Sequence, residues 1–394
     1  MCFKLAKFVI SFKGFVFLQP RRGVAIGRAG VACSVQLTLD RSHTAPENMP
    51  AGGLVVVLAA SAMVPSTTWS PLELPASNQI PDGAVVLGFP LARGAFGSVH
   101  WASLDGKRVI AKRAARNRPN ADAYLHAEAA INAKVGALHP ASCHLAPFVG
   151  VCSVGWVNHL VWQACPGVQQ SLEAYLNGGR LRELARDLGL IPSTSSDSFD
   201  VQHLGSALLA EMLSALAMVH RDGIVHRDIK PANWVVDTHT RSLRLIDFGA
   251  AIDTSTVTAG QTLITPATTA YAPPELRLIH DRPWAYDVYS VALVWLRVVS
   301  ASSRDFDALC TKLRTQGQRI ERTLTAGTSL LSSKAVDDVL PRLLDVDPYS
   351  RMSAAEALGS SFYETNKPTA DLTDGSGCEE DFSCRLDWDT AVDG

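Results

Sequence analysis

The stretch of sequence that decides the fold reads His226-Arg227-Asp228-Ile229-Lys230-Pro231-Ala232-Asn233 and then, fourteen positions after Asn233, Asp247-Phe248-Gly249. Between these two polar motifs lie the apolar run Trp234-Val235-Val236 and a second apolar run at 243–246, separated by a polar turn at 237–241. Two short apolar runs around a polar turn predict a β-hairpin. A hairpin of this length returns the chain to its start, so we expect Asp247 to lie beside Asn233.

Two segments upstream carry further candidate residues. The first is Leu91-Ala92-Arg93-Gly94-Ala95-Phe96-Gly97-Ser98-Val99, and thirteen residues after Val99 the apolar run Val109-Ile110-Ala111 ends on Lys112. In this order the motifs resemble those of the eukaryotic-type protein kinase family, which has a glycine-rich loop, a strand lysine, a His-Arg-Asp catalytic loop and an Asp-Phe-Gly motif. The resemblance extends from about residue 85 to residue 362.

The resemblance implies an α+β, bilobal protein-kinase fold, with a small β-rich N-lobe that holds one helix and a larger α-helical C-lobe. We place the N-lobe at 80–165 and the C-lobe at 166–362. Apolar residues recur at helical spacing over 204–220, which predicts a buried helix leading into the catalytic loop. The segment 178–200 is expected to be a loop insertion.

The resemblance also implies ATP and Mg²⁺ as cofactors and a role for each candidate residue. Asp228 would accept the proton of the substrate hydroxyl, and Lys230 would stabilise the migrating phosphoryl group and mark serine/threonine substrates. Asn233 and Asp247 would hold the Mg²⁺ ions. The remaining nucleotide-binding residues lie in the glycine-rich loop and after it, and are Ala92, Gly94, Gly97, Val99, Lys112 and Glu128.

Glu128 is assigned by elimination. A kinase needs a glutamate to hold the strand lysine, and Glu128 is the one Glu between Lys107 and Leu172. It lies in an Ala-rich run over 121–131 with strong helix propensity. Asp122 is the nearby acid that could substitute, but it lies close to the start of the helix.

Three residues around the expected nucleotide pocket bear on its size and shape. Ala92 replaces the first glycine of the family's loop, and Ile110 replaces the small residue that lies against the adenine ring. Trp162 falls at the back of the pocket, where an indole would close off the space behind the nucleotide. The alternative is that Ile110 and Trp162 simply fill the core.

Two acids downstream are assigned structural roles by the resemblance. Glu275, in Tyr271-Ala272-Pro273-Pro274-Glu275, should pair with Arg351 and anchor the substrate-binding platform. Asp287 opens a buried helix and needs a partner there; the family directs this carboxylate at the backbone of the catalytic loop. Short strings around Trp162, Asp247 and Glu275 also resemble the thylakoid-associated serine/threonine kinases of algae and plants.

Composition limits the partners. Of 394 residues, 47% are hydrophobic and 19% charged, which is ample material for a core. The net charge of −2 argues against nucleic acid or an anionic membrane as the main partner, and the expected partner is a protein substrate with Ser or Thr hydroxyls. The eight cysteines show no zinc-ligand spacing and are typical of a reduced, intracellular protein. The oligomeric state is not indicated.

The two ends of the chain differ from its middle. No acid precedes Asp40 while six basic residues do, so 1–79 is interpreted as a targeting or disordered leader, with plastid or mitochondrion as the destination. Its uncharged stretch at 48–72 is interrupted by polar residues and falls short of the ~20 apolar residues that span a bilayer. A membrane-spanning helix is therefore not the favoured interpretation, and the sequence does not decide whether the leader associates with a membrane. The acidic segment 363–394 is expected to be a disordered tail.

Three functions remain in competition. The leading hypothesis is an ATP-dependent serine/threonine protein kinase. The alternative is a pseudokinase that acts as a binding scaffold, which Ala92 and Ile110 motivate because nucleotide must fit against both. A small-molecule kinase on a related fold is the third, and the long Thr-rich segment before Glu275 argues against it.

Overall fold

The computed structural model describes residues 11–12, 14–15, 74–94, 97–114, 121–164, 169–191, 199–256, 270–275, 277–300, 302–316 and 334–362. The chain divides into two units, Met1–Thr67 and Thr68–Gly394. In the first unit the description covers only the paired strands β1 (Ser11–Phe12) and β2 (Gly14–Phe15). Nearly all of the predicted leader and all of the predicted tail therefore lie outside the described residues.

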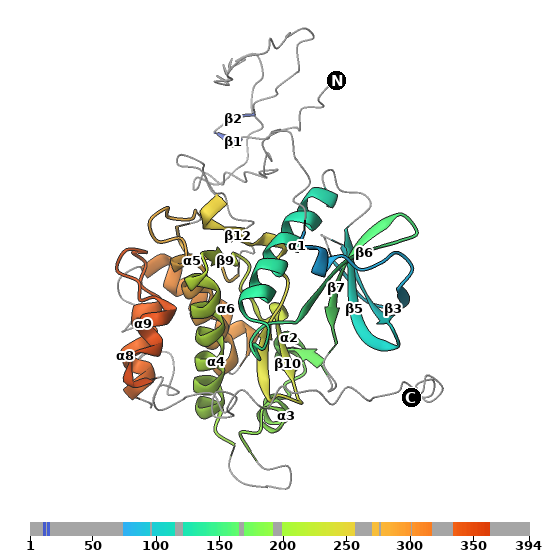
Figure 1. Ribbon diagram of the computed structural model, residues 1–394. Helices are drawn as coiled ribbons and strands as arrows, with labels where there is room; N and C mark the ends of the chain where they lie inside the picture. Colours follow the sequence, from blue (N-terminus) through green and yellow to red (C-terminus); the bar gives the residue numbers. More distant parts are fainter. Residues whose placement is uncertain are drawn as a thin grey trace, which may run out of the picture. The chain divides into compact units, whose positions relative to one another are not determined.

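The small lobe of the second unit is one antiparallel sheet in the order β3-β4-β5-β7-β6, with the helix α1 (Ala121–Leu138) beside it (Figure 1). Its strands are β3 (Val85–Gly94), β4 (Gly97–Leu104), β5 (Lys107–Ala114), β6 (Phe148–Val154) and β7 (Val157–Gln163). Successive side chains of a strand point to opposite faces. Val161 accordingly joins an apolar cluster within the sheet, whereas Leu160 packs with Leu125 and Ala129 of α1.

A short segment before β3 closes the outer edge of this sheet. It contains the 3-10 turn η1 (Ala76–Asn78). Gln79 forms a parallel bridge with Val151 of the edge strand β6, and the Asn78 side chain donates to the Val149 carbonyl at 3.2 Å. The approach is so close that a Cβ on Gly150 would lie 2.3 Å from the Asn78 carbonyl oxygen. The last residues of the predicted leader are thus already part of the small lobe's packing.

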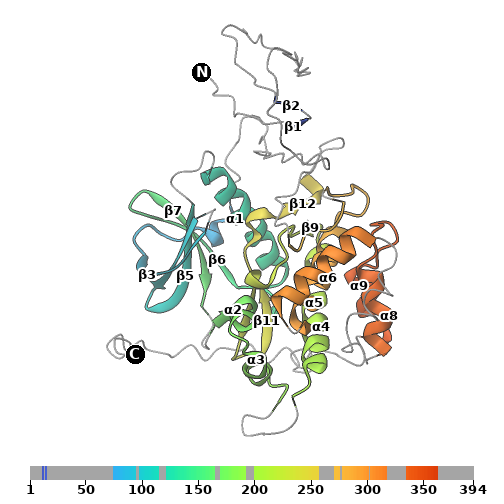
Figure 2. The same ribbon diagram turned by 180° about the vertical axis from the view of Figure 1, so that it is seen from behind.

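The large lobe is mainly helical, and in both views α4, α5, α6, α8 and α9 lie on the side of α1 away from the sheet (Figure 1, Figure 2). Its helices are α2 (Leu172–Asn177), α3 (Leu181–Asp187), α4 (Val201–Arg221), α5 (Ala285–Val299), α6 (Ser303–Gln316), α8 (Lys334–Leu343) and α9 (Ala354–Leu358). Short strands and turns connect them: β8 (Gln169–Ser171), β9 (Ile224–Val225), η2 (Pro231–Asn233), β10 (Trp234–Asp237), β11 (Ser242–Leu245), η3 (Phe248–Ala250), β12 (Ile252–Asp253) and η4 (Thr254–Thr256). These two lobes confirm the predicted α+β, bilobal fold class.

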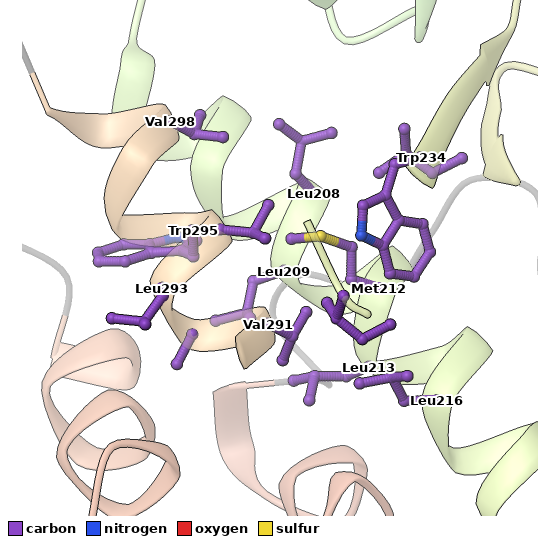
Figure 3. Packing of buried hydrophobic residues seen from close by; sticks show 14 of the residues in the cluster. Leu208, Leu209, Met212, Leu213, Leu216, Trp234, Val291, Leu293, Trp295 and Val298 are labelled. Atoms are coloured by element: carbon purple, nitrogen blue, oxygen red, sulfur yellow. The ribbon is translucent and has the colours of Figure 1, made fainter. Parts of the chain in front are cut away.

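The helix α4 runs through the centre of the large lobe and packs against α5. Leucine side chains and Met212 of α4 pack against Val291, Trp295 and Val298 of α5, and Trp234 of β10 lies on the opposite side of these α4 side chains (Figure 3). Within the described part of the chain, α4 is the one helix long and apolar enough to cross a bilayer, but 67% of that apolar window is buried inside the protein. It is therefore a core helix, as its periodicity predicts.

The prediction of a plain loop at 178–200 is wrong in part. The segment contains α3, whose Leu184 and Ala185 are buried in the large core. Burial of these side chains stabilises a helix that is too short to persist alone. Residues 192–198 of this segment lie outside the described residues.

The predicted hairpin is confirmed and places the polar motifs. β10 and β11 pair antiparallel with Trp234 opposite Leu245. Asp237 closes the turn, because its carboxylate accepts from the His239 amide at 2.9 Å and from Arg244 Nε at 2.8 Å. One residue beyond β11, the Ile246 amide donates to the Asn233 carbonyl at 3.0 Å. The residue after it, Asp247, therefore lies beside Asn233.

Candidate active site

The strand lysine joins two carboxylates that are distant in sequence. Lys112 Nζ lies 2.7 Å and 2.8 Å from the two carboxylate oxygens of Glu128 and 2.6 Å from Asp247 Oδ1. Lys112 comes from β5, Glu128 from the second turn of α1, and Asp247 from the turn after β11. The structure therefore brings together Lys112 and Glu128, which the sequence pairs by elimination, and adds a contact to Asp247 that the sequence does not indicate. Asp122, the alternative acid, is not part of this group of contacts.

Burial and charge act against each other in this cluster. Burial lowers the pKa of Lys112, but the two carboxylates outweigh it and the net direction is upward. Burial would raise the pKa of Asp247, yet the adjoining ammonium holds it below its usual range. Glu128 is the most deeply buried of the three, and burial raises its pKa to about 7 against the opposing effect of Lys112. The ammonium of Lys112 is thus held charged by the pair.

A second group of contacts forms in the catalytic loop. Lys230 Nζ donates to Asp228 Oδ2 at 2.6 Å. Asn233 Nδ2 donates to the Asp228 carbonyl at 2.8 Å and to Asp228 Oδ2 at 3.2 Å. These bonds orient the Asp228 carboxylate. Both bonds of the Asn233 side chain pass through its nitrogen, so its Oδ1 is the atom available as an oxygen ligand.

A buried carboxylate from α5 holds the backbone of the loop that carries Asp228. Asp287, fully buried at the start of α5, accepts from the His226 amide at 2.7 Å and from the Arg227 amide at 2.8 Å. His220 Nε2 lies 3.0 Å from the same carboxylate. Arg227 adopts φ +65°, a left-handed conformation that costs a non-glycine residue energy and persists only where neighbours enforce it. The scaffolding role predicted for Asp287 is confirmed.

The two groups of contacts are connected through His226. Its Nε2 lies 3.0 Å from the Ile246 carbonyl, and its ring meets Phe248 edge-on at 5.0 Å between centroids. The side chain is fully buried. His226 therefore has the structural role that the sequence favours.

The glycine-rich segment lies in β3 and β4, and β4 pairs with β5, the strand that carries Lys112. Ala92 pairs with Val99, Gly94 pairs with Gly97, and Val99 pairs with Lys112 in the next ladder. A Cβ on Gly97 would lie 1.9 Å from the Arg113 carbonyl oxygen, so glycine is required here by the close approach of β5. The residues between the two glycines, 95–96, lie outside the described part of the chain.

Two bulky residues face this site from neighbouring strands. Ile110 and Trp162 are direct partners in the ladder between β5 and β7, two residues from the pair of Lys112 and Leu160. Directly opposed residues share a face, so both side chains lie on the face that carries Lys112. Trp162 Nε1 donates to Asn132 Oδ1 at 3.1 Å. Trp162 is therefore hydrogen-bonded and not only core filling, and Asn132 is a residue near the site that no sequence signal marks.

The pair expected between Glu275 and Arg351 in the large lobe is also present. Arg351, which is fully buried, reaches both oxygens of Glu275 at 2.6 Å and 3.0 Å and donates to the Ala285 carbonyl at 2.8 Å. Most of the Thr-rich segment that precedes Glu275, residues 257–269, lies outside the described residues. The bidentate pair anchors the end of that segment to the helical core, as predicted.

The donors present fit a magnesium ion bound together with phosphates. Mg²⁺ takes oxygen ligands and is usually held by one or two carboxylates plus substrate phosphates. Asp247 offers a carboxylate, and Asn233 offers the amide oxygen that its hydrogen bonds do not use. In the part of the chain that the structure describes, no group of three or more His, Cys, Asp or Glu side chains could form a metal cage by itself.

Comparison with known proteins adds to this geometry. A family model described as "Protein kinase domain" matches residues 90–363. The serine/threonine-protein kinase PknA of Mycobacterium tuberculosis is 40% identical over 95 residues, which are 24% of this chain and 21% of that protein. Sperm motility kinase 3A of Mus musculus is 29% identical over 210 residues, 51% of this chain and 38% of that protein. The chain thus spans well under half the length of these curated relatives.

One solved structure supports the fold. A crystal structure of a Stt7 homolog from Micromonas algae soaked with ATP superposes with a TM-score of 0.59, over 71% of this chain and 92% of that chain. The two sequences are 23% identical, so the likeness shows the fold alone.

Proposed function

Because the family model covers more than half of it, this chain belongs to the protein kinase domain family, and we propose that it is an ATP-dependent serine/threonine protein kinase that transfers the γ-phosphoryl group of Mg-ATP to Ser or Thr hydroxyls of proteins. The observation that carries this proposal is the convergence of Lys112, Glu128 and Asp247 in one set of contacts. The names of the curated relatives support the serine/threonine assignment.

The residues of the catalytic loop would do the proton chemistry. Asp228 would accept the proton of the attacking hydroxyl, and its carboxylate is already oriented by Lys230 and Asn233. Lys230 would shift from this carboxylate to the migrating phosphoryl group, whose charge it would neutralise. Asp287 would keep the backbone before Asp228 in place during this step, because its carboxylate accepts from the His226 and Arg227 amides.

The residues of the small lobe would hold the nucleotide. Lys112 would pair with the α- and β-phosphates while Glu128 keeps it in place, and the backbone of Ala92, Gly94 and Gly97 would cover the phosphates together with Val99. Asn233 and Asp247 would hold Mg²⁺, which supplies charge neutralisation to the phosphates. Lys112 now contacts Asp247 as well as Glu128, so phosphate binding would replace the contact to Asp247.

A pseudokinase that binds partners as a scaffold remains the second candidate. Ile110 and the opposed Trp162 favour it, because both bulky side chains face the site where a base would lie. A thermal-shift titration with Mg-ATP separates the two. A kinase is stabilised by a ligand that binds its folded state, whereas an unchanged Tm at millimolar nucleotide would favour the scaffold.

Two substitutions test the catalytic proposal. Asp228→Asn and Lys112→Met should each reduce phosphorylation of a generic Ser/Thr protein substrate by about 10²-fold or more, the size expected for loss of a general base or of transition-state charge stabilisation. Asp281→Asn, at an exposed position, is the control. Circular dichroism must show the same helix content in all four proteins. Unchanged turnover in either active-site variant would contradict the role of the residue that it replaces.

Targeting to a plastid or mitochondrion stays a proposal that rests on the basic, acid-poor composition of the leader. Fusing residues 1–79 to a fluorescent protein and locating the fusion in a plant or algal cell would test it.

A further inference from the structure

The amide side chain of Asn132 lies buried on α1, one helical turn after Glu128. It is 4% exposed. Its Nδ2 donates to the Glu128 carbonyl at 2.8 Å, and its Oδ1 accepts from Trp162 Nε1 at 3.1 Å. The amide is therefore satisfied at both ends, and its orientation is set by one bond to its own helix and one bond to β7.

The indole that meets this amide is itself held in place. The Trp162 ring packs edge-on against Phe148 of β6, with 5.6 Å between centroids and 61° between planes. Its strand is in register with β5, so the Trp162 side chain leaves the same face of the sheet as Lys112. The helix α1 is thus fastened to one face of the sheet at two successive turns, at Glu128 by Lys112 and at Asn132 by Trp162.

The hydrogen bond from Trp162 to Asn132 differs from the ion pair between Lys112 and Glu128 in the groups that can compete for it. The Lys112 ammonium is shared between Glu128 and Asp247, and in the proposed function it is shared with phosphates as well. The bond from Trp162 to Asn132 involves none of these charged groups, so nucleotide phosphates would not compete for it. A buried amide in an apolar site is costly unless it is hydrogen-bonded, and rotation of α1 away from the sheet would leave both Asn132 and Trp162 unsatisfied.

We propose that Trp162 and Asn132 are positioning residues that hold α1 in the orientation in which Glu128 reaches Lys112. The inference rests on the proposed function in that Lys112 and Glu128 are taken to bind nucleotide phosphates. It gives the bulky Trp162 a role in organising the site. It also explains why a polar side chain is kept in the apolar interface between α1 and the sheet.

The test uses the full-length protein with two substitutions, their double variant and a control substitution. Trp162→Phe removes the indole N–H while keeping an aromatic ring against Phe148. Asn132→Leu removes the acceptor and leaves a side chain of similar size. Trp156→Phe, at a fully exposed tryptophan of the turn between β6 and β7, is the matched control. The double variant Trp162→Phe/Asn132→Leu completes the cycle.

The kinetic readout compares the Michaelis constant for ATP with the Michaelis constant for a peptide substrate that carries a Ser or Thr hydroxyl. Trp162→Phe should raise KM for ATP about fivefold, the effect of one buried hydrogen bond, and leave KM for the peptide unchanged. A purely structural loss would lower the amount of active enzyme and kcat without moving KM for ATP. In the Asn132→Leu background the same substitution should have little further effect, because the bond is already absent.

Hydrogen exchange at the amides of α1 gives a readout that does not need activity. Exchange around 128–132 should rise in Trp162→Phe relative to α4, and should not rise in the control. If exchange and KM for ATP are unchanged in Trp162→Phe, or if its effect is the same with and without Asn132, the inference is overturned. If the wild-type protein phosphorylates nothing but α1 responds as described, the proposed function fails while the positioning of α1 stands.

Discussion

Replacing Asp287 by Asn should destabilise the protein and disorganise the loop that carries Asp228. The carboxylate has no exposed surface and serves three donors, the amides of His226 and Arg227 and the His220 ring. Asn is nearly the same size but has one oxygen. With that oxygen turned toward His226, its NH₂ group faces the Arg227 amide, and two donors oppose each other.

The cost follows from the bonds that are lost. A hydrogen bond to a charged group contributes ~1.5–3 kcal/mol, and a buried donor left without an acceptor costs ~1–3 kcal/mol. In Asp287→Asn the bond from the Arg227 amide is lost outright, and the bond from the His226 amide is weakened by the loss of charge. We therefore expect destabilisation of about 2–4 kcal/mol. The left-handed φ of Arg227 is enforced by this bond, so the loop is also expected to relax and activity to fall further than the stability change alone requires.

Urea unfolding followed by tryptophan fluorescence measures the change, with Asp281→Asn as the exposed control. The pH dependence has a definite sign. Burial alone would raise the pKa of Asp287, but His220 and the backbone donors outweigh it and hold the pKa below its usual range. The ionised carboxylate therefore stabilises the fold above about pH 4, the usual range for Asp, and this contribution is lost as the pH falls further through the lowered pKa.

The difference in the free energy of unfolding between wild type and Asp287→Asn should accordingly be largest at pH 6 to 7 and become smaller as the pH falls. A destabilisation below 1 kcal/mol at neutral pH, or a difference that grows as the pH falls, would refute this reasoning.

Two further substitutions test the packing around the site. Glu275→Ala leaves the buried Arg351 without its carboxylate and should cost about 3–5 kcal/mol in urea unfolding, whereas adding Arg351→Met should recover part of that loss; a single-variant cost under 1 kcal/mol would contradict the pair's importance. Gly150→Ala places a Cβ 2.3 Å from the Asn78 carbonyl oxygen and should release the segment before β3, seen as faster proteolysis there. Gly136→Ala, whose Cβ would lie 3.9 Å from its nearest neighbour, is the control, and equal cleavage of the two variants would count against the close approach.

Much of the site could be predicted because its signals are local. The hairpin over 234–246 follows from two apolar runs and a polar turn, and Asp237 supplies the hydrogen bonds that such a turn needs. Glu128 could be found because no other Glu competes for Lys112 in that part of the chain. The cost of an unpaired buried acid predicts that Asp287 needs a partner, and the resemblance to the family identifies that partner as the backbone of the catalytic loop.

What could not be predicted depends on contacts between distant segments. The bond from Trp162 to Asn132 joins residues thirty positions apart, and an Asn inside a helix carries no signal of its own partner. The bridge from Gln79 to Val151 is likewise a non-local pairing. The helix α3 is hard to predict for another reason, since Leu181, Leu184 and Leu188 do have helical spacing but stand beside a Ser-rich run that dominates the local composition.

The bridge at Gln79 has a practical consequence for anyone who prepares the catalytic region alone. An edge strand with unpaired amides and carbonyls is a template for association with another chain. A recombinant fragment that starts at Val85 would uncover β6 along this side, and we expect it to self-associate through that edge at concentrations where a fragment from Leu74 stays monomeric. Light scattering of the two fragments would show whether those eleven residues serve as a built-in guard against aggregation.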